Sequence, residues 1–169
     1  MDESFLSVER DIERPSPHPS PQGGEGGAAF SIRPFDPADA DSCIRIFDRA
    51  WHAAHPYAPR TIDRAVFERE TQEETILVAE TPGHGVIAFG AVHLPGKFIH
   101  HLYVEPSAHG RGIGKTLLAR LVETAGGEAT LKCQTKNPAA LAFYARLGWT
   151  PGEAGASSFG PWVRMHSPA

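Results

Sequence analysis

The chain is poor in cysteine, has no long apolar run and carries no excess of positive charge. Its 169 residues include only Cys43 and Cys133, and no CxxC pair, so neither a disulfide scaffold nor a structural zinc site is indicated. No apolar stretch approaches the roughly 18 residues of a membrane span, and the N-terminus lacks the apolar core of a secretory signal. We therefore expect a soluble cytoplasmic protein whose cysteines are small buried hydrophobic residues.

The net charge of −4 argues against a protein that holds nucleic acid on a broadly basic surface. Residues 97–169 nevertheless carry eight Lys or Arg against four acids, whereas residues 30–96 carry six Arg against ten acids. An anionic ligand, such as a nucleotide-bearing cofactor, is therefore expected in the C-terminal half, although an imbalance of this size also arises by chance. The histidines show no metal-ligand spacing with carboxylates, so no metal site is predicted.

The length and composition fit one globular domain with one core, since 41% of the residues are hydrophobic. Residues 1–29 differ from the rest because prolines on alternate positions are followed by a cluster of glycines. Such a composition buries too little apolar surface to offset the entropy of ordering. We expect a disordered tail over 1–29, with a polyproline II ligand as the alternative, and a folded domain over 30–169.

Apolar periodicity predicts strands and helices throughout the domain. Strands are expected over 30–35, 75–79, 86–94, 98–105, 129–135, 149–153 and 160–166. Helices are expected after Asp36, after Thr61, from Ile113 and after Asn137, the second of them burying Ile62, Ala65 and Val66. This order of elements describes a mixed α/β sheet without an internal repeat.

The segment 104–118, VEPSAHGRGIGKTLL, leads from an expected strand into an expected helix. Alternating glycines let the backbone approach a ligand, and the amides and dipole of a helix N-terminus favour an anion. A Walker A loop would need glycine where His109 stands, and the GxGxxG dinucleotide motif would need glycine where Lys115 stands. A nucleotide-phosphate site is therefore a minor alternative.

The same loop resembles the pyrophosphate loop of the GNAT superfamily of acyl-CoA N-acyltransferases, Gln/Arg-x-x-Gly-x-Gly/Ala after a strand ending in Val. Here Val104 is followed by HGRGIG at 109–114, and His109 departs from the usual Gln or Arg. We expect His109 to change one side-chain contact with the pyrophosphate and to leave the contacts from the loop's backbone amides in place. A second match, NPAALAFYARLGW at 137–149, resembles the family's N-x-x-A-x-x-F-Y-x-x-x-G-F/W segment. The order of elements extends the resemblance to about 30–166.

The resemblance implies the GNAT fold, a mixed and mostly antiparallel sheet flanked by helices. In this fold the pantetheine arm of acetyl-CoA lies between two splayed strands, here 98–104 and 129–135. Backbone groups of Leu102 and Val104 would bind the arm and the thioester carbonyl, and the glycine loop would hold the pyrophosphate. The implied cofactor-binding residues are Leu102, Tyr103, Val104, His109, Gly110, Arg111, Gly112, Ile113, Gly114, Lys115, Thr116, Asn137, Phe143 and Tyr144.

The resemblance also implies two catalytic residues. Tyr144 matches the family's general acid, which protonates the departing CoA thiolate. His100 matches a histidine of the arylalkylamine-type members and is the preferred base for the acceptor ammonium, with His101, Glu105 and ordered water as alternatives. Because side chains alternate along a regular strand, His100 and His101 are expected on opposite faces. Without the motif, Tyr144 would be interpreted as core packing and the histidine pair as having no catalytic task.

The acceptor groove implied by the resemblance lies at the first two expected helices and their loop. Trp51, His55 and Tyr57 are its candidate wall residues, although Trp51 also fits the core. The implied activity is transfer of an acetyl group from acetyl-CoA to a primary amine of a small molecule or peptide, by direct attack in a ternary complex. A homodimer is compatible with the family, and neither nucleic acid nor membrane is an expected partner. The alternative is a non-catalytic CoA-binding regulatory protein on the same fold.

Overall fold

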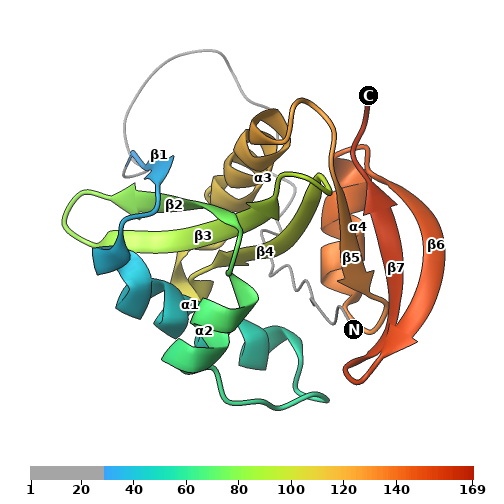
Figure 1. Ribbon diagram of the computed structural model, residues 1–169, viewed down its shortest axis with the longest axis horizontal. Helices are drawn as coiled ribbons and strands as arrows, with labels where there is room; N and C mark the ends of the chain where they lie inside the picture. Colours follow the sequence, from blue (N-terminus) through green and yellow to red (C-terminus); the bar gives the residue numbers. More distant parts are fainter. Residues whose placement is uncertain (1–28) are drawn as a thin grey trace.

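The computed structural model describes residues 29–169, so nearly all of the expected tail lies outside the described residues. The described part contains one sheet and four α-helices (Figure 1). Its elements are β1 (Ser31–Pro34), η1 (Pro37–Asp39), α1 (Ala40–Ala54), α2 (Arg64–Glu70), β2 (Thr75–Thr81), β3 (Gly85–His93), β4 (Phe98–Val104), η2 (Pro106–Ala108), α3 (Ile113–Thr124), β5 (Thr130–Gln134), α4 (Pro138–Arg146), β6 (Thr150–Ser157) and β7 (Gly160–His166).

The seven strands are arranged in the order β1-β2-β3-β4-β5-β7-β6. Every neighbouring pair is antiparallel except β4 and β5, which are parallel. The chain reaches β5 from β4 through α3, as a parallel pair requires a long crossover connection. The predicted fold class, a mixed and mostly antiparallel sheet flanked by helices, is confirmed.

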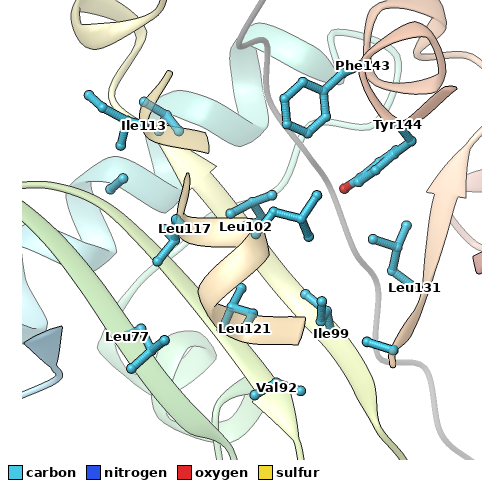
Figure 2. Packing of buried hydrophobic residues seen from close by; sticks show 14 of the residues in the cluster. Leu77, Val92, Ile99, Leu102, Ile113, Leu117, Leu121, Leu131, Phe143 and Tyr144 are labelled. Carbon is cyan, nitrogen blue, oxygen red and sulfur yellow. The ribbon is translucent and has the colours of Figure 1, made fainter. Parts of the chain in front are cut away.

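Helices cover both faces of the sheet, because alternating strand residues build two separate apolar clusters. On one face, Leu117 and Leu121 of α3 pack with Leu102 of β4 (Figure 2). On the other face, Phe47 of α1 packs with Phe89 and Tyr103 of β3 and β4. The strands β2, β3 and β4 are therefore buried on both sides.

Glycine at position 90 allows α3 to lie close against β3. A Cβ atom built on Gly90 would lie 2.5 Å from Cδ1 of Leu121 and 3.1 Å from the carbonyl oxygen of His101. Such an atom would push the helix away from the sheet, since a packed core has no spare room for it. The spacing between α3 and β4 next to the candidate site depends on this contact.

Two details of the predicted elements were wrong. The helix α2 buries Phe67, whereas Ala65 is exposed and Val66 half-buried, because the helix begins at Arg64 after an Asp63 N-cap. The strand β6 runs to Ser157 rather than ending at 153, and most of its residues are exposed. A strand whose residues are mostly exposed lacks a regular row of apolar side chains, so the sequence pattern did not reveal the full length of β6.

Candidate active site

The strands β4 and β5 separate after a single paired position. Phe98 and Thr130 are partners in the parallel ladder, and the described residues of the two strands form no pair beyond this one. Along its other edge, β5 pairs with β7 over its whole length, from Thr130 to Gln134. Beyond Phe98, the edge of β4 that faces β5 therefore has no strand partner among residues 29–169, as the splayed strands of the predicted fold require.

The backbone of β4 has hydrogen-bonding groups directed at this opening. Val104 lies opposite Ala88, and the amide of Glu105 donates to the carbonyl of Ile87 at 2.7 Å. Hydrogen-bonded and non-hydrogen-bonded pairs alternate in an antiparallel ladder, so Leu102 and Val104 occupy non-hydrogen-bonded positions. Their N–H and C=O groups consequently point away from β3, toward the β5 side.

The glycine loop has the backbone conformation that only glycine adopts without strain. Gly110 and Gly112 have φ angles of 77° and 74°, and a Cβ atom on either would meet nothing within 4 Å. Gly112 is the N-cap residue of α3 and provides no side-chain cap. Arg111 and Lys115 are exposed beside the loop. The helix N-terminus, its dipole and two cations therefore act on the same region, which suits a pyrophosphate.

His109, the residue that departs from the family pattern, joins the loop to the end of β4. Its Nε2 lies 3.2 Å from the carbonyl oxygen of Val104, within hydrogen-bonding distance when Nε2 carries the proton. The carbonyl of Val104 is among the groups that point away from β3. The sequence predicted only a changed side-chain contact here, and the structure supplies its partner.

Tyr144 lies on α4 and is completely buried. Asn137 caps this helix, its side-chain oxygen accepting from the amide of Ala140 at 3.1 Å, so the asparagine has a structural task in addition to the predicted one. The Tyr144 ring packs against Phe143 and Trp149, and its hydroxyl is directed from α4 toward the β4 side (Figure 2). This buried hydroxyl has no hydrogen-bond partner among residues 29–169.

Burial raises the pKa of Tyr144 well above its ordinary value, and the neighbouring Cys133 and Tyr103 act in the same direction. The hydroxyl is therefore protonated at neutral pH. A buried proton donor without a partner is unusual, since nearly all buried polar groups in proteins are hydrogen-bonded. Both properties suit a residue that donates its proton to a group arriving between β4 and β5.

The two histidines of β4 lie on the same side of the sheet, contrary to the predicted alternation. Val92 is opposite Ile99 while Ala91 is opposite His101, so His100 is an extra residue that forms a β-bulge. A bulge redirects side chains, and the two imidazole centroids are 6.4 Å apart. His100 Nδ1 lies 2.6 Å from Glu74 Oε1, and His101 Nε2 lies 3.1 Å from the carbonyl oxygen of Glu70. Both rings thus contact the α2–β2 segment, by which we mean the last residue of α2 and the residues that join it to β2 (70–74).

Sequence reasoning missed a buried charged cluster on the α1 side of β4. Arg60 and Glu70 form an ion pair whose side chains are only 12% and 16% exposed. The guanidinium carbon of Arg60 lies 4.9 to 5.6 Å from the ring centroids of Trp51, Phe159 and Phe47. These residues come from three separate parts of the chain and share no motif, so no local signal identifies the cluster.

The predicted acceptor residues are gathered near this cluster, but they differ in accessibility. Trp51 is fully buried, donates from Nε1 to the carbonyl of Ala58 at 2.7 Å and stacks on His55. His55 is also fully buried, whereas Tyr57 is 36% exposed and lies under Lys136. Trp51 and His55 therefore form the floor of this region, and Tyr57 is the one predicted wall residue with a substantial exposed surface.

The buried histidines predict a loss of stability in mild acid. Burial lowers the pKa of His55 to about 4 and that of His101 to about 3. Because these folded-state values lie below the unfolded value of about 6.5, the unfolded chain binds more protons below that pH. The stabilising contribution is present above about pH 6.5 and declines as the pH falls toward 4, by up to about 1.4 kcal/mol per pH unit for each histidine.

Urea denaturation at several pH values measures this decline. The variant His101→Phe should have a slope of unfolding free energy against pH that is smaller by about 1.4 kcal/mol per pH unit between pH 6 and 4. His84→Gln, in the exposed turn between β2 and β3, serves as the control and should keep the wild-type slope. Equal slopes in wild type and His101→Phe would contradict a buried neutral imidazole.

Three further observations concern the described part of the chain. Within residues 29–169, no helix has the length and apolarity that a bilayer crossing needs. The same residues contain no group of three or more His, Cys, Asp or Glu side chains arranged to hold a metal ion. Glu105, an alternative base, forms an ion pair with Arg49 at 3.0 Å.

Comparison with known proteins identifies the family. The acetyltransferase (GNAT) family matches residues 40–149. N-alpha-acetyltransferase RimI of Mycobacterium tuberculosis is 30% identical over 120 residues, which is 66% of this chain and 73% of the relative. Glucosamine 6-phosphate N-acetyltransferase 1 of Oryza sativa subsp. japonica is 32% identical over 157 residues, 82% of this chain and 93% of the relative.

A solved structure has the same fold. The putative acetyltransferase yncA of Salmonella typhimurium, determined with acetyl-CoA, superposes with a TM-score of 0.65 at 24% identity, covering 82% of this chain and 92% of that one. The family match spans the glycine loop, the separated strands and the helix that carries Tyr144. The chain therefore belongs to the GNAT acetyltransferase family.

Proposed function

We propose that this protein is an N-acetyltransferase that moves the acetyl group of acetyl-CoA to a primary amine by direct attack in a ternary complex. The observation that carries the proposal is the opening between β4 and β5, where the backbone groups of Leu102 and Val104 point away from β3. Acetyl-CoA is the co-substrate, as in the related structure determined with it. An extended pantetheine arm has amide groups that complement the backbone groups of such a strand edge.

The residues of the opening suit the parts of acetyl-CoA. The glycine loop over 109–116 would bind the pyrophosphate through backbone amides, with Arg111 and Lys115 adding positive charge. The pantetheine arm would lie along Leu102 and Val104. Asn137, the buried N-cap residue of α4, and Phe143, buried within α4, would line the opposite side of the opening between β4 and β5.

The same residues would perform the chemical step. As the amine attacks, the thioester oxygen gains negative charge, and the fixed N–H of Val104 is placed to stabilise it. A carbon–nitrogen bond forms, the carbon–sulfur bond breaks, and Tyr144 donates its proton to the leaving sulfur. Before the attack, the ammonium gives one proton to a base on β4, for which His100 is the preferred residue. As the amide forms, its nitrogen loses a second proton, which restores the Tyr144 hydroxyl. The protein's main contributions are orientation and charge stabilisation.

An assay of thiol release tests the proposal. Purified protein is incubated with acetyl-CoA and pooled primary amines while a thiol reagent follows free CoA, and calorimetry measures cofactor binding in parallel. Amine-dependent thiol release together with binding is the expected result. Binding without release for any amine pool would favour the non-catalytic CoA-binding alternative, and absence of binding would overturn the assignment of the glycine loop.

Replacing Gly112 with alanine should weaken acetyl-CoA binding by about 10-fold, a change of about 1.4 kcal/mol. Alanine at a φ of 74° is strained by roughly 1–2 kcal/mol, and relief of that strain moves the first amides of α3 away from the pyrophosphate. Calorimetric titration with acetyl-CoA measures the effect.

Gly126→Ala is the matched control for this prediction. Gly126 follows the other end of α3, has a φ of 93° and, like Gly112, has nothing within 4 Å of a built Cβ atom. This variant should lose similar stability but keep the wild-type dissociation constant. Equal weakening in both variants would show that the loss reflects general strain rather than the loop.

A further inference from the structure

Glu74 and His100 form a close contact between two buried side chains from distant segments. Glu74 lies directly before β2, and His100 is the bulged residue of β4. The distance from Glu74 Oε1 to His100 Nδ1 is 2.6 Å, and the side chains are 4% and 10% exposed. Such a length is typical of a hydrogen bond strengthened by charge.

This contact determines which nitrogen of His100 carries the proton. An ionised carboxylate only accepts hydrogen bonds, so the neutral ring must donate from Nδ1. Nε2 then holds the lone pair and is the atom able to accept a proton. The arrangement is that of a base oriented by a carboxylate, in which the carboxylate fixes the ring and stabilises the imidazolium that forms.

The neighbouring groups distinguish His100 from His101. His101 is enclosed by the rings of Phe47 and Tyr103, and its Nε2 contacts a backbone carbonyl instead of a carboxylate. Burial lowers the pKa of His101 to about 3, so it stays neutral at physiological pH. The other imidazole near His100 is that of His93, with centroids 6.3 Å apart. Among the three histidines, His100 alone has a hydrogen bond to a carboxylate.

We propose that Glu74 is a positioning residue that fixes His100 with its proton on Nδ1, so that Nε2 takes the proton of the acceptor ammonium. This role rests on the proposed acetyl transfer. The nitrogen lone pair that is released attacks the thioester, the carbon–sulfur bond breaks, and the leaving thiolate takes the proton of Tyr144. The nitrogen loses its second proton as the amide forms, which restores Tyr144, and His100 later returns its own proton to solvent. The bulge is part of the arrangement, because regular alternation would turn one histidine away from the α2–β2 segment.

The tautomer of His100 is tested first, by a measurement that does not depend on turnover. In protein labelled with ¹⁵N-histidine, the His100 ring, assigned by comparison with His100→Asn, should show the proton on Nδ1. Glu74→Ala should shift the ring toward the Nε2–H form. Glu74→Gln should keep the Nδ1–H form, because the amide oxygen still accepts. A ring that is unchanged in Glu74→Ala, or that carries the proton on Nε2 in the wild type, would overturn the inference.

Turnover is tested second, with the amine found in the thiol-release assay. Glu74→Ala and Glu74→Gln should each lower kcat by about 10-fold or more, because the base loses the carboxylate that stabilises its imidazolium, while KM for acetyl-CoA changes less than about 2-fold. Glu80→Gln, on the strand that directly follows Glu74 and paired with Arg33 at 2.8 Å, should keep the wild-type kcat. An unchanged kcat in both Glu74 variants would overturn the inference. If the wild type itself transfers no acetyl group, the proposed function fails, whereas the tautomer measurement still decides the Glu74–His100 geometry.

Discussion

Tyr144→Phe is expected to lower kcat by about 100-fold while the dissociation constant of acetyl-CoA changes little. The substitution removes only the hydroxyl, which is fully buried and has no hydrogen-bond partner among the described residues. The ring contacts with Phe143 and Trp149 are retained. The effect should therefore appear in turnover, where the proton is needed, rather than in binding.

The acidity of this hydroxyl is consistent with donation to sulfur in this environment. Burial raises the pKa of Tyr144 well above 10, which alone would disfavour transfer to a thiolate in water. The thiolate is destabilised by the same burial, as the neighbouring Cys133 shows, because burial raises the pKa of its thiol to about 12. A CoA sulfur leaving into this region would likewise be a stronger base than in water.

Steady-state kinetics and thermal denaturation together check this prediction. The hydroxyl has no hydrogen-bond partner among residues 29–169, so Tyr144→Phe should be as stable as the wild type or slightly more stable. Thr81→Val is a matched control, because it removes another buried and unpartnered hydroxyl at the far end of β2 and should leave kcat unchanged. Full activity of Tyr144→Phe would exclude the tyrosine as the acid.

Glu70→Gln is expected to lower the free energy of unfolding by about 3 kcal/mol, the largest stability effect predicted for this chain. The substitution leaves the Arg60 guanidinium without its carboxylate in a region where its side chain is 12% exposed. The surrounding rings of Phe47, Trp51 and Phe159 compensate only partly for a buried unpaired cation.

Urea denaturation measures this loss of stability, and two further variants test whether it comes from the unpaired charge of Arg60. Glu80→Gln removes a carboxylate whose ion pair with Arg33 is about one-third exposed, so its cost should be within about 1 kcal/mol. The double variant Arg60→Met, Glu70→Leu removes both charges and should recover most of the stability, since apolar residues can replace a buried pair. A loss below about 1 kcal/mol for Glu70→Gln would show that water reaches the guanidinium.

Much of the local structure around the proposed cofactor site could be predicted from the sequence. The glycines at 110, 112 and 114, the Asn137 cap and Tyr144 lie in two contiguous segments, and their spacing depends on local backbone requirements. Positive φ angles, helix starts and helix caps are decided within a few residues. The backbone conformation at these positions can therefore be predicted from the neighbouring residues in the sequence.

The acceptor side could be predicted only in part. The segment that contains Trp51, His55 and Tyr57 was identified, but not that Trp51 and His55 are fully buried. The bulge at His100 was missed, because an extra residue in one strand is defined only by the partner strand. Glu74, Arg60 and Glu70 have no local pattern that marks them.

The sequence by itself determined the order of elements, the glycine loop and the family, because helix, strand and turn preferences act between residues close in the chain. Only the tertiary structure decided which charged groups meet. The pairs Glu74–His100 and Arg60–Glu70 form because α1, α2 and β4 pack together. The same packing buries these side chains, so each can pair only with the group that lies next to it in the fold. Burial and long-range pairing depend on the whole fold, so the proton path proposed for this enzyme could not be predicted from the chain alone.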